Sequence, residues 1–156
     1  MSRDRGKEFE VKFKKDFLDS VPNSTIDRLY DPVNGYMSIS NISDFIGYSK
    51  PSIYYLECKT SKGASLPFVN ITQYEKLKGK VGIPGVRAGI ILWLYEKDIV
   101  MYIPISTITQ MKSDGKKSVG LKAIQEGYNI KIIPSQKKRV FMDSDYSCLC
   151  NLEDGE

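Results

Sequence analysis

Histidine is absent from the 156-residue sequence, and this absence excludes several common kinds of catalytic site. Neither a Ser-His-Asp triad nor a zinc site with histidine ligands can form, and no imidazole can serve as a general base. Any acid–base chemistry would have to come from carboxylates, lysines, tyrosines or a metal-bound water.

Cysteine and long apolar runs are also scarce. Cys58, Cys148 and Cys150 are too few for a disulfide framework, so we expect reduced thiols, and the last two lack further ligands for a metal. The longest apolar run, residues 88–95, is too short to span a bilayer, and no signal peptide is recognisable. We therefore expect a cytoplasmic protein without a membrane partner.

The length of the chain suits one domain with a sizeable core. We assign this domain to residues 1–150 and expect the acidic residues 151–156 to form a flexible tail. No internal repeat or low-complexity segment divides the chain.

Hydrophobic periodicity predicts an α/β fold with a mixed central sheet flanked by helices. The first helix has a stripe made by Phe9, Phe13 and Phe17. Strands are expected at residues 26–30, 42–47, 52–59, 87–95, 99–103 and 129–133. Helices are expected at residues 2–18, at 70–78 with Asn70 as N-cap, at 105–111, and at 118–126 with Ser118 as N-cap, while 61–67 is expected to be a polar loop.

Three residues carry the most informative spacing. Asp44 precedes a predicted hairpin turn, and Glu57 and Lys59 follow on the second strand of that hairpin. A turn around Ser49 and Lys50 would place Asp44 diagonally across from Glu57, at roughly 7–8 Å between backbones. Alternation along the strand puts Glu57 and Lys59 on one face of the sheet.

This arrangement suits phosphodiester hydrolysis with a divalent metal ion. Asp44 and Glu57 would hold the ion, helped by the backbone carbonyl of Cys58, and Mg²⁺ prefers such oxygen ligands. Lys59 would stabilise the transition state or orient the attacking water. Glu10 could reach the same cluster from the first helix. The alternative is an exposed hairpin face on which these charges only pair with their neighbours, because the spacing alone is a loose pattern.

Clusters of basic residues fit the same interpretation. The net charge is only +4, but lysine and arginine occur in runs at 12–15, 116–117 and 137–139. Such runs are usually solvated surface. Beside a metal-nuclease pattern, we interpret them as contacts to nucleic-acid phosphates.

Asp44 and the sequence Glu57-Cys58-Lys59 resemble the core of the PD-(D/E)xK nucleases. Further blocks, in the same order, are similar to those of the RecU-like Holliday junction resolvases, so that the resemblance extends from about residue 3 to 146. These blocks are Arg-Gly-Lys-Glu-Phe-Glu at 5–10, Asp-Phe-Ile-Gly at 44–47, Glu-Cys-Lys-Thr at 57–60, Ser-Leu-Pro-Phe at 65–68, Asn-Ile at 70–71, Gln73, Lys-Ser-Val at 117–119 and Gly-Tyr at 127–128.

The resemblance implies a restriction-endonuclease-like fold and a specific activity. The protein would be a structure-selective endodeoxyribonuclease of DNA recombination and repair. It would cut four-way junctions symmetrically as a homodimer, with Mg²⁺, or Mn²⁺ in its place, as cofactor. Glu10 matches the helix carboxylate of the family and Gln73 its helix glutamine, which adds both to the catalytic set. For Gln73, a solvated or helix-packing role is an equal alternative.

Two departures from the family pattern leave the substrate open. Ser43 replaces the proline of the PD motif, which is a tolerable variation. Residues 31–43 are short where the family has a long stalk that engages the junction centre, which would suit a phage-encoded version. The alternatives are a PD-(D/E)xK nuclease that acts on flaps, ends or single strands, or a non-catalytic nucleic-acid-binding module with the same fold.

Overall fold

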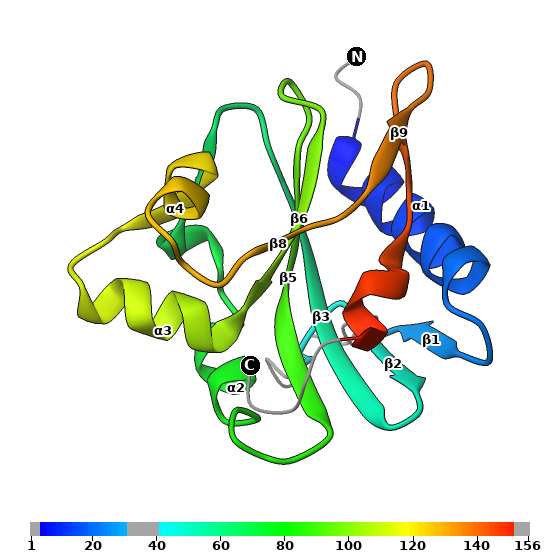
Figure 1. Ribbon diagram of the computed structural model, residues 1–156, viewed down its shortest axis with the longest axis horizontal. Coiled ribbons are helices and arrows are strands. Elements are labelled where there is room, and N and C mark those ends of the chain that lie inside the picture. The colour runs from blue at the N-terminus through cyan, green and yellow to red at the C-terminus, as the bar shows by residue number, and fades with distance from the viewer. Residues whose placement is uncertain (1–3, 31–40, 152–156) are drawn as a thin grey trace, which may run out of the picture.

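The computed structural model describes residues 4–30 and 41–151 of the chain. A central six-stranded sheet separates two layers (Figure 1). The long N-terminal helix and the C-terminal segment cover one face, and three shorter helices cover the other. Residues 31–40, where the resemblance implies a shortened stalk, and residues 152–156 of the expected tail lie outside the described part.

The sheet is mixed, as the sequence predicts. Its strand order is β1-β2-β3-β5-β6-β8. Strands β3 and β5 are parallel, and every other neighbouring pair is antiparallel. The strands are β1 (Thr25–Arg28), β2 (Phe45–Ser49), β3 (Ser52–Ser61), β5 (Val86–Leu94), β6 (Ile99–Pro104) and β8 (Lys131–Ile132). The continuous apolar run of β5 is buried almost throughout, as expected of a central strand covered on both faces.

Helix α1 (Arg5–Ser20) packs its phenylalanine stripe against one face of the sheet. Phe9, Phe13 and Phe17 are almost fully buried. The helix begins at the N-cap Asp4, whose carboxylate accepts a hydrogen bond from the Lys7 amide. The same face is covered by the hairpin of β9 (Ser135–Lys137) and β10 (Met142–Ser144) and by the 3₁₀ helix η2 (Tyr146–Asn151). The β9–β10 hairpin was not predicted from the sequence.

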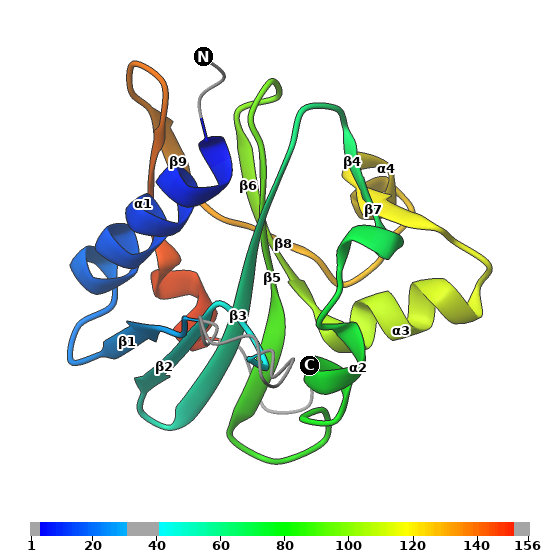
Figure 2. The same ribbon diagram turned by 180° about the vertical axis from the view of Figure 1, so that it is seen from behind.

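The second apolar layer contains the shorter elements. It includes α2 (Tyr74–Lys78), α3 (Ile105–Ser113), α4 (Leu121–Gln125), the 3₁₀ helix η1 (Phe68–Asn70), and a two-stranded ribbon of β4 (Ser65–Pro67) and β7 (Ser118–Gly120). Figure 2 shows this ribbon beside α4, with α2 and α3 below it.

Three predictions about this layer were wrong. Ser65–Pro67 is a strand rather than part of a loop, and Ser118 begins its partner strand rather than capping a helix. Asn70 ends η1, and the next helix starts only at Tyr74. Each β segment is three residues long, and their partners are distant in sequence, so no local periodicity could reveal the pairing.

The register of the β2–β3 hairpin also corrects the prediction. Ser49 pairs with Ser52, so the turn is Lys50–Pro51, and Phe45 faces Leu56. Proline has no N–H to give to a ladder, which suits it to the turn rather than to the strand. Continuing the register by one residue places Asp44 opposite Glu57, closer than the predicted diagonal. Because the shift is two residues, each side chain keeps its predicted face.

Among the described residues, no helix has both the length and the apolar character needed to cross a membrane.

Candidate active site

Three of the sequence-predicted charged residues line a cavity of about 460 Å³ between α1, β3 and β4, whereas Glu57 is not among its lining residues. Figure 2 shows α1 and β4 on opposite sides of strand β3, in keeping with their packing in different apolar layers. Glu10 comes from α1, Asp44 from the residue before β2, and Lys59 from β3. The lining comprises Asp4, Gly6, Lys7, Glu10, Asp44, Cys58, Lys59, Thr60, Leu66 and Asn70. We call it the catalytic cavity.

Asp44 is held in place by the neighbouring strands. Its Oδ2 accepts a hydrogen bond of 2.9 Å from the amide of Cys58, and its carbonyl accepts one of 2.7 Å from Leu29. These bonds fix the carboxylate beside β3, next to Glu57 in the continued register. The hairpin therefore brings together the two carboxylates that the sequence pattern singled out.

Glu57 is buried and incompletely paired. Its side chain is 5% exposed, and its Oε2 has no hydrogen-bond partner. Burial first, and then the adjacent Asp44 carboxylate, raise the pKa of the Glu57 carboxyl to about 9, while Lys59 opposes the shift. A buried carboxylate oxygen without a partner is costly, and a bound cation would relieve that cost.

Arg28 is a site residue that the sequence analysis missed. It lies at the end of β1 and bridges the carboxylates of two other elements. Its Nε donates to Glu10 Oε2 at 2.8 Å, and its Nη2 lies 3.6 Å from Asp44 Oδ1. The guanidinium also donates to the carbonyls of Leu29 and Asp44. These contacts tie α1 to the start of β2.

A signal for Arg28 was present in the sequence. Ile26 and Arg28 alternate with the exposed Asp27 on the first predicted strand, so they share the face that packs on α1. A cation on a core-facing position needs a carboxylate partner. Glu10, on the neighbouring helix, was the available candidate.

Glu10 lies close to the cluster but pairs with Arg28. Burial raises the pKa of the Glu10 carboxyl, and the hydrogen bond from Arg28 opposes this rise. Asp44 contributes a further increase through its negative charge. Glu10 is thus placed to hold Arg28. If the Arg28 guanidinium moved away, the Glu10 carboxylate would be left facing the cavity.

Lys59 and Gln73 differ in their placement. Lys59 lines the catalytic cavity, and strand alternation puts it on the same face as Glu57. Gln73 occupies the N-cap position of α2 and is not among the residues that line the cavity. Asn70 lines it instead. A catalytic role for Gln73 stays a prediction without support from this geometry.

The donor set suits a hard divalent cation only in part. Within residues 4–30 and 41–151, no three carboxylate, thiol or imidazole side chains form a ready-made metal cluster. Mg²⁺, however, is commonly held by one or two carboxylates and several waters. Asp44 and the unpartnered Oε2 of Glu57 meet that requirement, while Arg28 engages the third carboxylate, Glu10.

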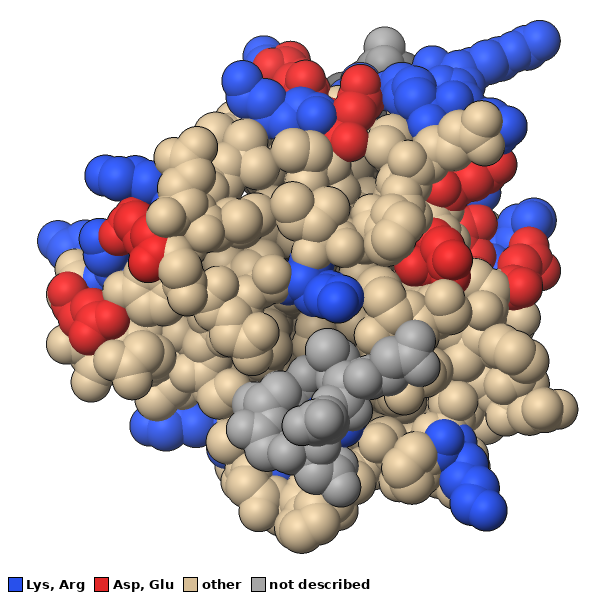
Figure 3. All heavy atoms as spheres, viewed as in Figure 1, with Lys and Arg blue, Asp and Glu red and all other residues tan. Residues whose placement is uncertain are grey.

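The basic runs are largely neutralised by acidic partners. Lys12 pairs with Asp16 and Asp143, at 2.8 and 2.5 Å. Lys137 pairs with Asp98 at 2.6 Å, and Lys138 also lies near Asp143. Figure 3 shows basic and acidic side chains intermingled along the margins of one face, rather than a continuous basic surface. Contacts between these runs and phosphates stay a prediction.

Comparison with known proteins identifies the fold class. A scan of protein-family models and a search of curated proteins gave no match. Among solved structures, the chain is similar to Hjc, a Holliday junction resolvase from the archaeal hyperthermophile Archaeoglobus fulgidus. The TM-score is 0.56, and the alignment covers 79% of this chain and 94% of that chain. The predicted restriction-endonuclease-like core is therefore confirmed. At 15% identity, the similarity shows the fold alone.

Proposed function

We propose that the protein is a metal-dependent endodeoxyribonuclease that resolves four-way DNA junctions. The observation that carries the proposal is the position of Asp44 beside the buried Glu57, whose Oε2 has no hydrogen-bond partner, with Lys59 on the same strand face. The restriction-endonuclease-like fold and its resolvase neighbour support this interpretation. Membership of the RecU-like group and an origin in a phage stay predictions.

The chemistry follows from the charges around the cavity. Asp44 and Glu57, with the carbonyl of Cys58, would hold Mg²⁺ or Mn²⁺, which when bound would activate water and neutralise developing charge. Lys59 would donate to a non-bridging oxygen of the phosphate as negative charge accumulates there. Attack by water forms one phosphorus–oxygen bond, and the bond to the leaving oxygen breaks as that oxygen gains a proton. Arg28 would position Glu10 and Asp44 rather than contact the reacting atoms.

Symmetric resolution of a four-way junction requires two cuts. A junction has two symmetry-related strands to cut, and a two-fold homodimer would present two matching cavities. We therefore propose a homodimer, in keeping with the resolvase resemblance. The short segment before Asp44 favours the alternative of a nuclease with broader preference for flaps, ends or single strands, because the stalk of the family would be missing.

A substrate comparison tests the proposal. A four-way junction, a flap, a linear duplex and a single strand are incubated with protein and Mg²⁺ or Mn²⁺, and products are resolved on denaturing gels. Symmetric nicking of the junction alone is expected. Equal cutting of every substrate would reject junction selectivity, and DNA binding without cleavage would indicate a non-catalytic module.

Asp44→Asn should lower the rate of DNA cleavage by about 100-fold or more, because it removes a negatively charged metal ligand at the reacting centre. DNA binding and the unfolding temperature should be nearly unchanged. Asp27→Asn is the matched control, since Asp27 is exposed on the neighbouring strand β1. Equal activity of the two variants would show that Asp44 has been misassigned.

A further inference from the structure

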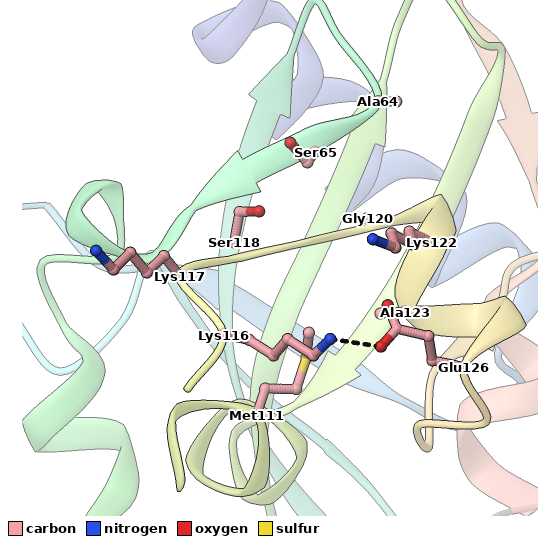
Figure 4. Close-up of a pocket in the computed structure, with 10 residues that line it drawn as sticks. All are labelled: Ala64, Ser65, Met111, Lys116, Lys117, Ser118, Gly120, Lys122, Ala123 and Glu126. Carbon is pink, nitrogen blue, oxygen red and sulfur yellow. Dashed lines mark hydrogen bonds and ion pairs between the residues drawn. The ribbon is translucent and has the colours of Figure 1, made fainter. Parts of the chain in front are cut away.

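A second cavity lies on the other side of the β4–β7 ribbon. Its volume is about 300 Å³, and it lies between that ribbon, the end of α3 and α4 (Figure 4). We call it the lysine pocket. Its lining comprises Ala64, Ser65, Met111, Lys116, Lys117, Ser118, Gly120, Lys122, Ala123 and Glu126.

The lysine pocket has an excess of positive charge. Three lysines and one glutamate line it, and Lys116 Nζ lies 2.6 Å from Glu126 Oε2. Figure 4 shows Lys122 without an ion pair to any other residue drawn, and Lys117 extending away from α4. Ser65 and Ser118 add hydroxyl groups. An ammonium group beside hydroxyl donors is suited to bind a phosphate oxygen through hydrogen bonds.

Strand β4 connects this pocket to the catalytic cavity. Ser65 lines the lysine pocket, whereas its neighbour Leu66 lines the catalytic cavity. Gly120 pairs with Ser65 and approaches so closely that an added Cβ would lie 1.9 Å from the carbonyl oxygen of Ala64. The two cavities are thus separated by a thin and tightly packed ribbon. A polynucleotide strand that crosses the catalytic cavity would reach the lysine pocket within a few nucleotides, at roughly 3.4 Å of rise each in a duplex.

We propose that the lysine pocket binds a backbone phosphate of the substrate strand, a few nucleotides from the phosphate that is cut. This inference rests on the proposed nuclease function and adds a second point of attachment to it. Lys122 supplies the main charge, and the two serine hydroxyls donate hydrogen bonds. Glu126 forms an ion pair with Lys116 and lowers the positive electrostatic potential of the pocket. Contacts of this kind fix the register of a nucleic acid without reading its sequence.

The experiment measures DNA affinity against salt concentration, in chelator so that the DNA stays intact. A labelled four-way junction and a labelled duplex are titrated with wild type, Lys122→Gln and Lys131→Gln. Lys131 is the matched control because it is exposed on β8, an edge strand that lies in front in Figure 1, away from β4. Loss of one phosphate contact should weaken binding by roughly 3- to 10-fold and reduce the salt slope by about 1 for Lys122→Gln only.

A second variant should have the opposite effect. Glu126→Gln removes the only carboxylate among the residues that line the pocket, and it releases Lys116. We expect tighter DNA binding and a steeper salt dependence. If the pocket only stabilised the fold, both variants would change the unfolding temperature and neither would change the salt slope.

Neutral methylphosphonates placed one at a time along the strand then locate the contact. One position should weaken the wild type and leave Lys122→Gln unaffected, since both changes remove the same interaction. If the wild type binds and cuts DNA while Lys122→Gln and Lys131→Gln behave alike, the lysine-pocket proposal fails and the nuclease proposal stands. If the wild type does not bind DNA at all, both fail.

Discussion

Arg28 holds two carboxylates that would otherwise repel each other beside the catalytic cavity. Its side chain is 22% exposed, so its pairs with Glu10 and Asp44 are shielded from most of the solvent. The guanidinium provides a fixed positive charge in the absence of a metal ion. A bound divalent cation would share that task, because its positive charge would offset the negative charge of the same carboxylates.

Arg28→Ala should therefore destabilise the protein in chelator by about 1–3 kcal/mol, because it leaves half-buried carboxylates without their partner. Added Mn²⁺ or Mg²⁺ should recover part of this loss, and it should stabilise the variant more than the wild type. Thermal and denaturant unfolding, with and without metal, measure both effects. Arg139→Ala, at an exposed site, is the control. Equal losses for the two variants would show that the Arg28 pairs contribute little.

Glu57 gives the metal-free protein a distinct pH dependence. Its pKa is raised from 4.5 to about 9 by burial, so the folded protein retains a proton that the unfolded chain has already lost between these values. The unfolded state then binds fewer protons, and stability falls as pH rises through this interval. One full proton corresponds to about 1.4 kcal/mol per pH unit.

Glu57→Gln should remove this contribution, because the amide is neutral at every pH. The stability of the variant relative to wild type should increase between about pH 5 and pH 8 in chelator, by roughly 1 kcal/mol per pH unit. Urea unfolding at several pH values tests this expectation. If the stability of the two proteins had the same pH dependence, Glu57 would be ionised in the folded state, with a cationic side chain neutralising its charge.

At the scale of the elements, periodic segments were predictable and short non-local pairs were not. The phenylalanine stripe of α1 and the apolar run of β5 each follow from a local pattern. Asp44 and Glu57 share a face of the sheet as predicted, although the turn of the β2–β3 hairpin was predicted wrongly, because a two-residue shift leaves each side chain on its face. The β4–β7 ribbon could not be predicted, since its pairing depends on tertiary packing.

Gly120 provides a test of that ribbon. Its backbone is extended, with φ of 178°, which any residue can adopt, so a substitution would act through steric clash. An added Cβ would lie 1.9 Å from the Ala64 carbonyl oxygen and 2.7 Å from Ser65 Cα. Gly120→Ala should destabilise the protein by about 1–3 kcal/mol, as overpacking of a well-packed site does.

The matched control for this prediction is Gly63→Ala, where an added Cβ would meet nothing within 4 Å. That substitution should change stability by less than about 0.5 kcal/mol. Urea unfolding of both variants gives the comparison. If Gly120→Ala were as stable as Gly63→Ala, the close approach of β7 to the 64–65 backbone would be wrong, and the boundary between the two cavities would have to be redrawn.

At the scale of the whole molecule, the catalytic cavity and the lysine pocket lie on either side of one ribbon. Under the two proposals, they would together bind a short stretch of one DNA strand. One chain would thus supply one cutting site. Resolution of a junction needs two cuts on opposite strands before the enzyme dissociates. The proposed homodimer would provide them, and a monomer would have to bind twice.

Mixed dimers distinguish these cases. Wild type and Asp44→Asn, carrying different tags, are co-expressed and the hybrid is purified through both tags. On a supercoiled plasmid with an extruded cruciform, two cuts within one binding event give linear DNA, and one cut gives a nicked circle that no longer holds the cruciform. We expect the wild-type dimer to give mainly linear product and the hybrid to give nicked circles, because only one of its cavities retains the Asp44 carboxylate. A monomeric enzyme would yield no hybrid through both tags, and its wild-type form would give nicked circles from the outset.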